Sequence, residues 1–135
     1  MNPSRIDGTG QHILVIDDDL AIRVLLQAVL SRLHFEVTLA EDGLTGLETL
    51  KEGSFDLILL DLMMPRMNGY QFLQRMAEIY ADGQRPHIIV FTAAGQRGVE
   101  KLPHDSACNS ILKPFDLEKF TEMMEECLNG SHSRK

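Results

Sequence analysis

A run of apolar residues that ends on a carboxylate constrains the fold of this chain more than any other feature. Leu57 to Leu60 are all apolar, and Asp61 follows them directly. Such a run predicts a strand buried on both faces, as in a parallel sheet. Pro65 and Asn68-Gly69 then predict a turn. Ligands of open α/β sheets bind just beyond the carboxyl ends of the strands, so we expect Asp61 at a binding edge. Taken alone, such an Asp has a simpler interpretation, as an acceptor for nearby loop amides.

The rest of the chain alternates between two hydrophobic patterns. Short apolar runs predict strands at residues 12–16, 36–40, 55–61, 87–91 and 110–112. Helical spacing predicts helices that begin at Leu20, Gly43, about Tyr70 and Asp116. The inward face of the third helix, which is predicted to end near Ala81, is expected to comprise Leu73, Met76, Ala77 and Tyr80. Residues 94–106 contain two glycines and a proline, so any helix there should be short. This alternation predicts an α/β fold, a parallel sheet covered on both faces by right-handed crossover helices.

Size and composition exclude several classes of protein. A length of 135 residues fits one domain, which we place at residues 12–129, between a flexible arm at 1–11 and a polar tail at 130–135. No apolar run approaches the roughly 20 residues of a membrane span. The arm has no apolar segment, so no secretory signal is expected.

Charge and cysteine content bear on partners and compartment. The net charge of −7 argues against direct binding to nucleic acid. Cys108 and Cys127 are too few for a disulfide framework and are expected to be small core residues. The low cysteine content favours a protein of the reducing cytoplasm.

Polar residues follow four of the predicted strands. Asp17 and Asp18 come after the first strand, Asp61 after the third, Thr92 after the fourth and Lys113 after the fifth, whereas the second gives only Ala40-Glu41. The four strands can be neighbours in a doubly wound sheet, so these groups should share one crevice. Ionised carboxylates that share a small site need compensation, which Mg²⁺ supplies well. Each residue alone has an ordinary interpretation, but their joint placement favours a shared site.

Four sequence blocks resemble the receiver domain of two-component response regulators. The blocks are Ile16-Asp17-Asp18-Asp19, Asp61 to Gly69, Phe91-Thr92-Ala93-Ala94 and Lys113-Pro114-Phe115. They occur in the order and at the spacings of that family, and the similarity covers residues 12–129. The resemblance implies a flavodoxin-like (βα)₅ fold with strand order 2-1-3-4-5. No DNA-binding or enzymatic region follows residue 129, so a stand-alone receiver is expected.

The same resemblance implies a role for each site residue. Asp61 matches the phosphoacceptor, and Thr92 matches the hydroxyl that turns toward the phosphoryl group. Lys113 matches the ion-pairing lysine, and its bond to Pro114 is expected to be cis. The implied Mg²⁺ ligands are Asp18, Asp61, the backbone carbonyl of Met63 and, through water, Asp17.

The resemblance also implies the partners and the kind of activity. The donor would be a phosphohistidine on a sensor histidine kinase or histidine phosphotransfer protein, and the downstream protein of this phosphorelay is unknown. No enzymatic activity is expected beyond self-catalysed phosphoryl transfer and autodephosphorylation.

The chain departs from the family in the region before the fifth strand. Many receivers have an aromatic residue where this chain has Ser110, and a Gly-Ala pair where it has Ser106-Ala107. The usual relay from Thr92 to that aromatic residue therefore lacks its second member. We expect instead a local change of order in residues 93–106, whose composition is the least favourable to stable structure.

Three other functions fit the sequence less well. A phosphatase of the haloacid dehalogenase type needs a threonine where Ala21 stands, and there is no room for a cap domain. A receiver-like binding module that no longer accepts phosphate would not need Asp18, Asp61, Thr92 and Lys113 all intact. A flavin carrier needs a phosphate loop after the first strand, but acid that would repel phosphate fills that position.

Overall fold

The fold is seen in a computed structural model that describes residues 7–80, 85–93, 95–102, 109–114 and 116–129. The strands are β1 (His12–Ile16), β2 (Glu36–Ala40), β3 (Leu57–Asp61), β4 (His87–Thr92) and β5 (Asn109–Leu112). The helices are α1 (Leu20–Arg32), α2 (Gly43–Glu52), α3 (Gly69–Ile79), α4 (Gly95–Glu100) and α5 (Leu117–Asn129). Within the described ranges, each helix is too short or too polar to cross a bilayer.

The strands form one parallel sheet in the order β2-β1-β3-β4-β5, which confirms the predicted order. Ile16 at the end of β1 lies opposite Leu60 of β3. Asp61 lies opposite Phe91, one residue before the end of β4. The carboxyl ends of the three central strands are therefore level, and the residues that follow them meet at one edge.

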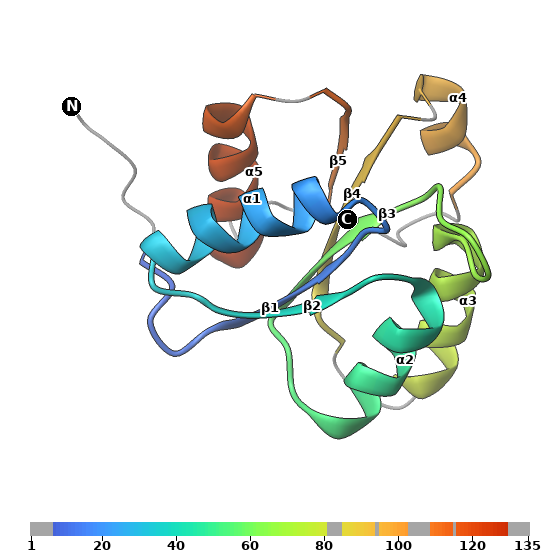
Figure 1. Cartoon of the computed structure of the whole chain (residues 1–135), viewed down its shortest axis with the longest axis horizontal. Coiled ribbons are helices and arrows are strands. Elements are labelled where there is room, and N and C mark those ends of the chain that lie inside the picture. The colour runs from blue at the N-terminus through green and yellow to red at the C-terminus, as the bar shows by residue number, and fades with distance from the viewer. Residues whose placement is uncertain (1–6, 81–84, 94, 103–108, 115, 130–135) are drawn as a thin grey trace.

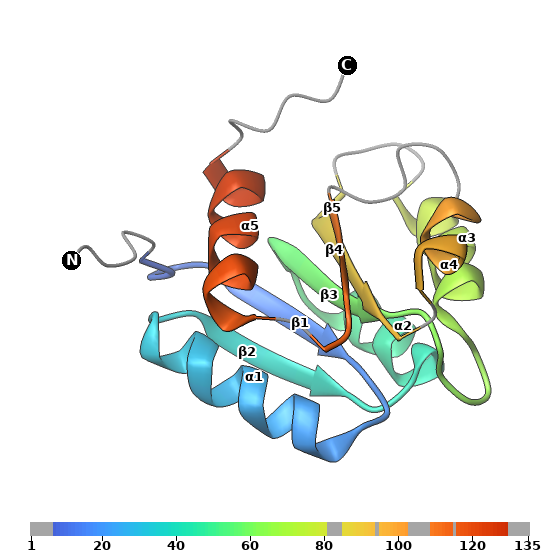
Figure 2. The ribbon, with the colours of Figure 1, turned by 90° about the horizontal axis from the view of Figure 1, so that it is seen from above.

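Helices cover both faces of the sheet, α1 and α5 on one side and α2, α3 and α4 on the other (Figures 1 and 2). Successive residues of β1 alternate between these layers: Ile13 and Val15 pack with α1 and α5, whereas Leu14 and Ile16 pack with α2 and α3. All of β3 is buried, as its apolar run predicts. Burying one such side chain contributes about 2 kcal/mol, so the buried central strands give the site a stable base.

Side-chain caps fix where the helices begin. Asp19 accepts a hydrogen bond from Ala21 N at the start of α1, at 2.9 Å. Asn68 and Gln71 form a reciprocal capping box at the start of α3. Because both caps lie beside the carboxyl ends of strands, they also shape the loops of the site.

Two sequence expectations need correction. The buried stripe of α3 comprises Gly69, Phe72, Leu73 and Met76, and Ala77 is exposed. Leu73 and Met76 are buried as predicted, and Tyr80 is partly buried against the core. The same face of the helix thus meets the sheet about one turn nearer to the start of the helix than predicted. Cys127 on α5 is buried and disulfide-bonded, so it is not a simple core thiol. Cys108 lies outside the described residues. Because Cys127 is disulfide-bonded, the cysteines do not support the expectation of a reducing compartment.

Candidate functional site

Three carboxylates from two strands meet at the sheet edge. Asp17 directly follows β1, Asp18 comes next, and Asp61 ends β3. One carboxylate oxygen from each residue lies within 4.8 Å of the others. Asp17 and Asp61 are buried, whereas Asp18 is exposed. The acids predicted to come together at the strand ends therefore do so.

Lys113 is the cation of this cluster. Its Nζ lies 2.9 Å from Asp17 Oδ2 and 3.6 Å from Asp61 Oδ2. Only 17% of its side chain is exposed, and Nζ lies 5.0 Å from the centre of the Phe91 ring. Lys113 N also donates to Thr92 O at 2.8 Å, which joins the ends of β4 and β5. The bond to Pro114 is cis, as expected.

The other predicted site residues lie around the acids. Thr92 ends β4 and is fully buried. Met63 N donates to Asp61 Oδ1 at 3.2 Å, while the Met63 side chain is exposed. Asp17 Oδ1 accepts a hydrogen bond from Asp19 N at 2.8 Å. The structure thus brings all six predicted residues to one edge of the sheet, and their chemical roles stay a prediction.

The site carries more acid than its lysine can neutralise. Burial, then the charge of Asp17, raises the pKa of Asp61 to about 6, against the opposing effect of Lys113. Burial likewise raises the pKa of Asp17, although the hydrogen bond from Lys113 opposes this. Burial alone would lower the pKa of Lys113, but its hydrogen bond with Asp17 and the charges of Asp17 and Asp61 raise it overall. A hard cation with oxygen ligands would relieve this excess of negative charge, so the donor set suits a divalent ion.

The raised pKa predicts how the stability of the metal-free protein depends on pH. Asp61 titrates near 6 in the fold and near 3.8 in the unfolded chain, so the fold favours its neutral form. The destabilisation of the fold by Asp61 is absent below about pH 4, grows as the pH rises to about 6, and stays constant above that pH. With chelator present, Asp61→Asn should therefore be more stable than wild type by about 2 kcal/mol at pH 8, after allowance for solvent on the open side of the site. Urea unfolding should show this difference shrink at pH 5, and an equal difference at both values would contradict the assignment.

Sequence reasoning missed three residues beside the site. Arg23 of α1 donates from Nη1 to Asp17 O at 2.6 Å. Asp42, directly after Ala40-Glu41, is 4% exposed and pairs with Arg66. The expectation that β2 supplies only Ala40-Glu41 is thus incomplete. One signal in the sequence could have found Asp42. It directly precedes Gly43, where a helix was predicted to begin, and an N-cap residue lies in the turn between strand and helix.

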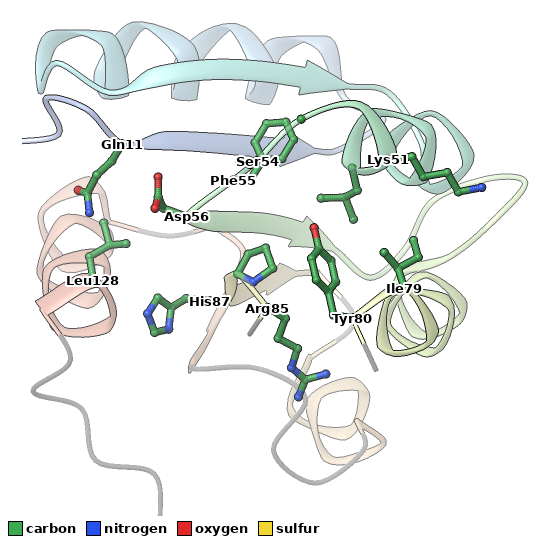
Figure 3. A pocket seen from close by; sticks show the side chains of 13 residues that line it. Gln11, Lys51, Ser54, Phe55, Asp56, Ile79, Tyr80, Arg85, His87 and Leu128 are labelled. Carbon is green, nitrogen blue, oxygen red and sulfur yellow. The ribbon is translucent and has the colours of Figure 1, made fainter. Parts of the chain in front are cut away.

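A hollow lies at the other end of the strands (Figure 3). It measures about 670 Å³ and is lined in part by Gln11, Asp56 and His87. These residues lie where β1, β3 and β4 begin, and Asp56 Oδ2 accepts a hydrogen bond from His12 N at 2.8 Å. Because Asp56 and Asp61 lie at opposite ends of β3, this hollow is separate from the acidic site.

A parallel sheet in the order 2-1-3-4-5, with an acidic cluster past its central strands and a lysine past the edge strand β5, defines a flavodoxin-like α/β domain. The family model of the response regulator receiver domain matches residues 13–125. The chain therefore belongs to the response regulator receiver domain family. It is a receiver domain of two-component response regulators, with the acidic cluster at its phosphorylation site.

Individual relatives and a solved structure support this family assignment. The chain is 33% identical over 115 residues to the probable chemotaxis protein CheY of Rhizobium etli, covering 84% of this chain and 88% of that protein. It is 34% identical over 131 residues to the transcriptional regulatory protein ZraR of Klebsiella oxytoca, covering 96% of this chain but only 28% of that protein. The structure of response regulator protein TrrA from Thermotoga maritima, in complex with Mg²⁺-BeF, matches with a TM-score of 0.77 and 29% identity, covering 87% of this chain and 99% of that one.

Proposed function

We propose that Asp61 accepts a phosphoryl group from a phosphohistidine of a sensor histidine kinase or histidine phosphotransfer protein. The observation that carries this proposal is the position of Asp61, which is 3% exposed, shares a cluster with Asp17 and Asp18, and lies 3.6 Å from Lys113 Nζ. A cytoplasmic location goes with this proposal, because the donor is a protein of an intracellular relay. The downstream partner is a protein of unknown identity.

The transfer follows from the properties of these side chains. With a pKa of about 6, Asp61 is mostly ionised at neutral pH and can act as a nucleophile. One of its oxygens bonds to phosphorus while the bond from phosphorus to the imidazole nitrogen breaks. The electron pair stays on that nitrogen, which takes up a proton. The positive charge of Lys113 compensates part of the negative charge on the phosphoryl oxygens.

A metal ion fits this site because three carboxylate oxygens converge on it and one lysine cannot balance them. We propose Mg²⁺, with Asp18 and Asp61 as direct ligands, Asp17 acting through water, and the backbone carbonyl of Met63 as a further ligand. When bound, the ion supplies charge neutralisation for the acids and the phosphoryl oxygens. The role of the chain is to hold these oxygens in place, while the charge of Lys113 opposes the rise in the pKa of Asp61.

The proposed function predicts a simple labelling result. Wild-type protein incubated with a small phosphodonor and Mg²⁺ should gain one phosphoryl group, read by intact mass. Chelation of the metal should slow this gain at least tenfold, because the acids would then repel the donor. No gain in mass, or a gain that ignores the chelator, would contradict the proposal.

The output is proposed to arise in the segment after β4. The Thr92 hydroxyl can donate to a phosphoryl oxygen, a bond worth about 1.5–3 kcal/mol with a charged acceptor. Moving Thr92 would carry Ala93 with it and disturb α4, which is braced by Tyr70 Oη donating to Gly98 O at 2.7 Å. Residues 94 and 103–106 of the segment lie outside the described residues.

Amide exchange tests this output. Within residues 93–106, phosphorylation should change the exchange rates at least severalfold, because the tie between Tyr70 and Gly98 would be strained or released. Residues of β1, buried and remote from α4, serve as an internal control. Equal rates in 93–106 with and without the phosphoryl group would refute this output.

We expect no catalytic turnover of external substrates. An excess of a generic phosphate ester should be left intact, because Ala21 stands where a phosphatase of the haloacid dehalogenase type has threonine. Multiple turnovers that depend on Asp61 would favour that phosphatase instead.

A further inference from the structure

An ion pair joins the two loops next to the acidic cluster. Arg66 lies in the loop between β3 and α3, and Asp42 lies directly before α2. Arg66 Nε donates to Asp42 Oδ2 at 2.9 Å, and Nη2 donates to the same oxygen. The other carboxylate oxygen, Oδ1, accepts from Thr45 N at 2.9 Å. Asp42 thus caps α2 with one oxygen and holds Arg66 with the other.

The backbone at Arg66 has a conformation that needs support. Its φ is +65°, in the left-handed region that side chains other than glycine and asparagine rarely adopt. Met67 N donates to Pro65 O at 2.7 Å across this residue. The fork from Arg66 to the buried Asp42 adds a second restraint, so the turn is fixed from both its backbone and its side chain.

The loop also packs directly on the first turn of α2. A Cβ placed at Gly43 would lie 2.9 Å from both Met67 Cγ and Met67 O. Met67 itself is 7% exposed. The start of α2 and the loop after β3 therefore form one packed unit, in which the ion pair lies next to the close contact.

This unit extends to the reactive carboxylate through Met63. Met63 N donates to Asp61 Oδ1 at 3.2 Å, and Met63 lies three residues before Arg66 in the same loop. We infer that Asp42 and Arg66 are a positioning pair, which holds the Met63 backbone against Asp61 and thereby sets the affinity of the site for a divalent cation. This inference rests on the proposed function, but neither residue is a ligand in it.

The direction in which one substitution changes the affinity for Mg²⁺ separates a positioning role from a purely electrostatic one. Arg66 is a cation beside an acidic site, so its removal should tighten Mg²⁺ binding if charge alone matters. If positioning dominates, its removal should weaken binding. Asparagine is the suitable replacement, because it tolerates the left-handed backbone but is too short to make the fork.

The test measures Mg²⁺ binding to the unphosphorylated chain by isothermal titration calorimetry. Arg66→Asn should raise the Kd about tenfold, the low end of the range for loss of a partner that orients a metal ligand. Arg66→Lys, which keeps the charge but loses the fork, should also weaken binding. Arg75→Gln, on the exposed side of α3, should leave the Kd unchanged and serves as the matched control. Unchanged or tighter binding in Arg66→Asn would overturn the inference.

A second measurement needs no metal. Amide exchange of residues 63–69 in the metal-free protein should be faster in Arg66→Asn than in wild type and in Arg75→Gln, while the exchange of β1 stays the same. Equal exchange in the loop would overturn the positioning role. If wild type binds no Mg²⁺ and accepts no phosphoryl group, the proposed function has failed, and the exchange result alone then decides whether the pair holds the loop.

Discussion

Asp61→Asn is expected to abolish incorporation of the phosphoryl group from a small phosphodonor, with a rate at least about 100-fold below wild type, because the nucleophile is gone. The amide keeps the shape of the carboxylate, and the buried site loses a charge that burial disfavours. The variant should therefore fold, and its failure to react cannot be attributed to unfolding. Intact mass after incubation with the phosphodonor and Mg²⁺ is the measurement.

The chain offers a matched control at the other end of the same strand. Asp56 precedes β3 and accepts a hydrogen bond from His12 N, which asparagine can also accept. Asp56→Asn should be labelled like wild type. Labelling that persists in Asp61→Asn, or that is lost equally in Asp56→Asn, would show that the reactive residue has been misassigned.

Lys113→Ala is expected to have the second largest effect, on both stability and labelling. It would leave Asp17 and Asp61 buried without their cation. Removing one partner of a buried ion pair costs about 3 kcal/mol or more. The loss should be larger at pH 8 than at pH 5, because the two acids can protonate at lower pH and so avoid the uncompensated charge. Labelling should slow at least about tenfold, since a charge that faces the phosphoryl oxygens is lost.

Urea unfolding with chelator present, at both pH values, measures the effect on stability. Lys119→Ala on α5 is the control, because Lys119 is exposed and a surface substitution should change stability by less than about 0.5 kcal/mol. A loss in Lys113→Ala no greater than in Lys119→Ala would mean that the lysine does not compensate the acids.

The sequence predicts most of the fold, because each buried strand is a short apolar run closed by a polar residue. Strand β3 illustrates the reason: its residues have no solvent face, so the run itself marks a central strand. The inward face of α3 was predicted less well. Helical spacing defines a stripe but does not say which turns of the helix meet the sheet, and Phe72 rather than Ala77 takes the inner position.

The core of the site was predictable because it follows from topology. Asp17 and Lys113 directly follow β1 and β5, and Asp61 ends β3. The carboxyl ends of all strands of a parallel sheet lie on the same side, so these residues come together there. The pairs of Arg23 with Asp17 and of Arg66 with Asp42 were not predictable in this way. Long side chains make these contacts across loops, and neither periodicity nor spacing fixes the direction in which such a side chain points.

A crystal structure of the chain grown with Mg²⁺ and beryllofluoride, which stands in for a phosphoryl group, tests the central claim most directly. Beryllium is expected to be bonded to a carboxylate oxygen of Asp61, with Mg²⁺ in contact with Asp18 and with Lys113 Nζ within hydrogen-bond distance of a fluorine. A structure in which the carboxyl groups of Asp18 and Asp61 bind no common ion, or in which beryllofluoride lies on another residue, would contradict it.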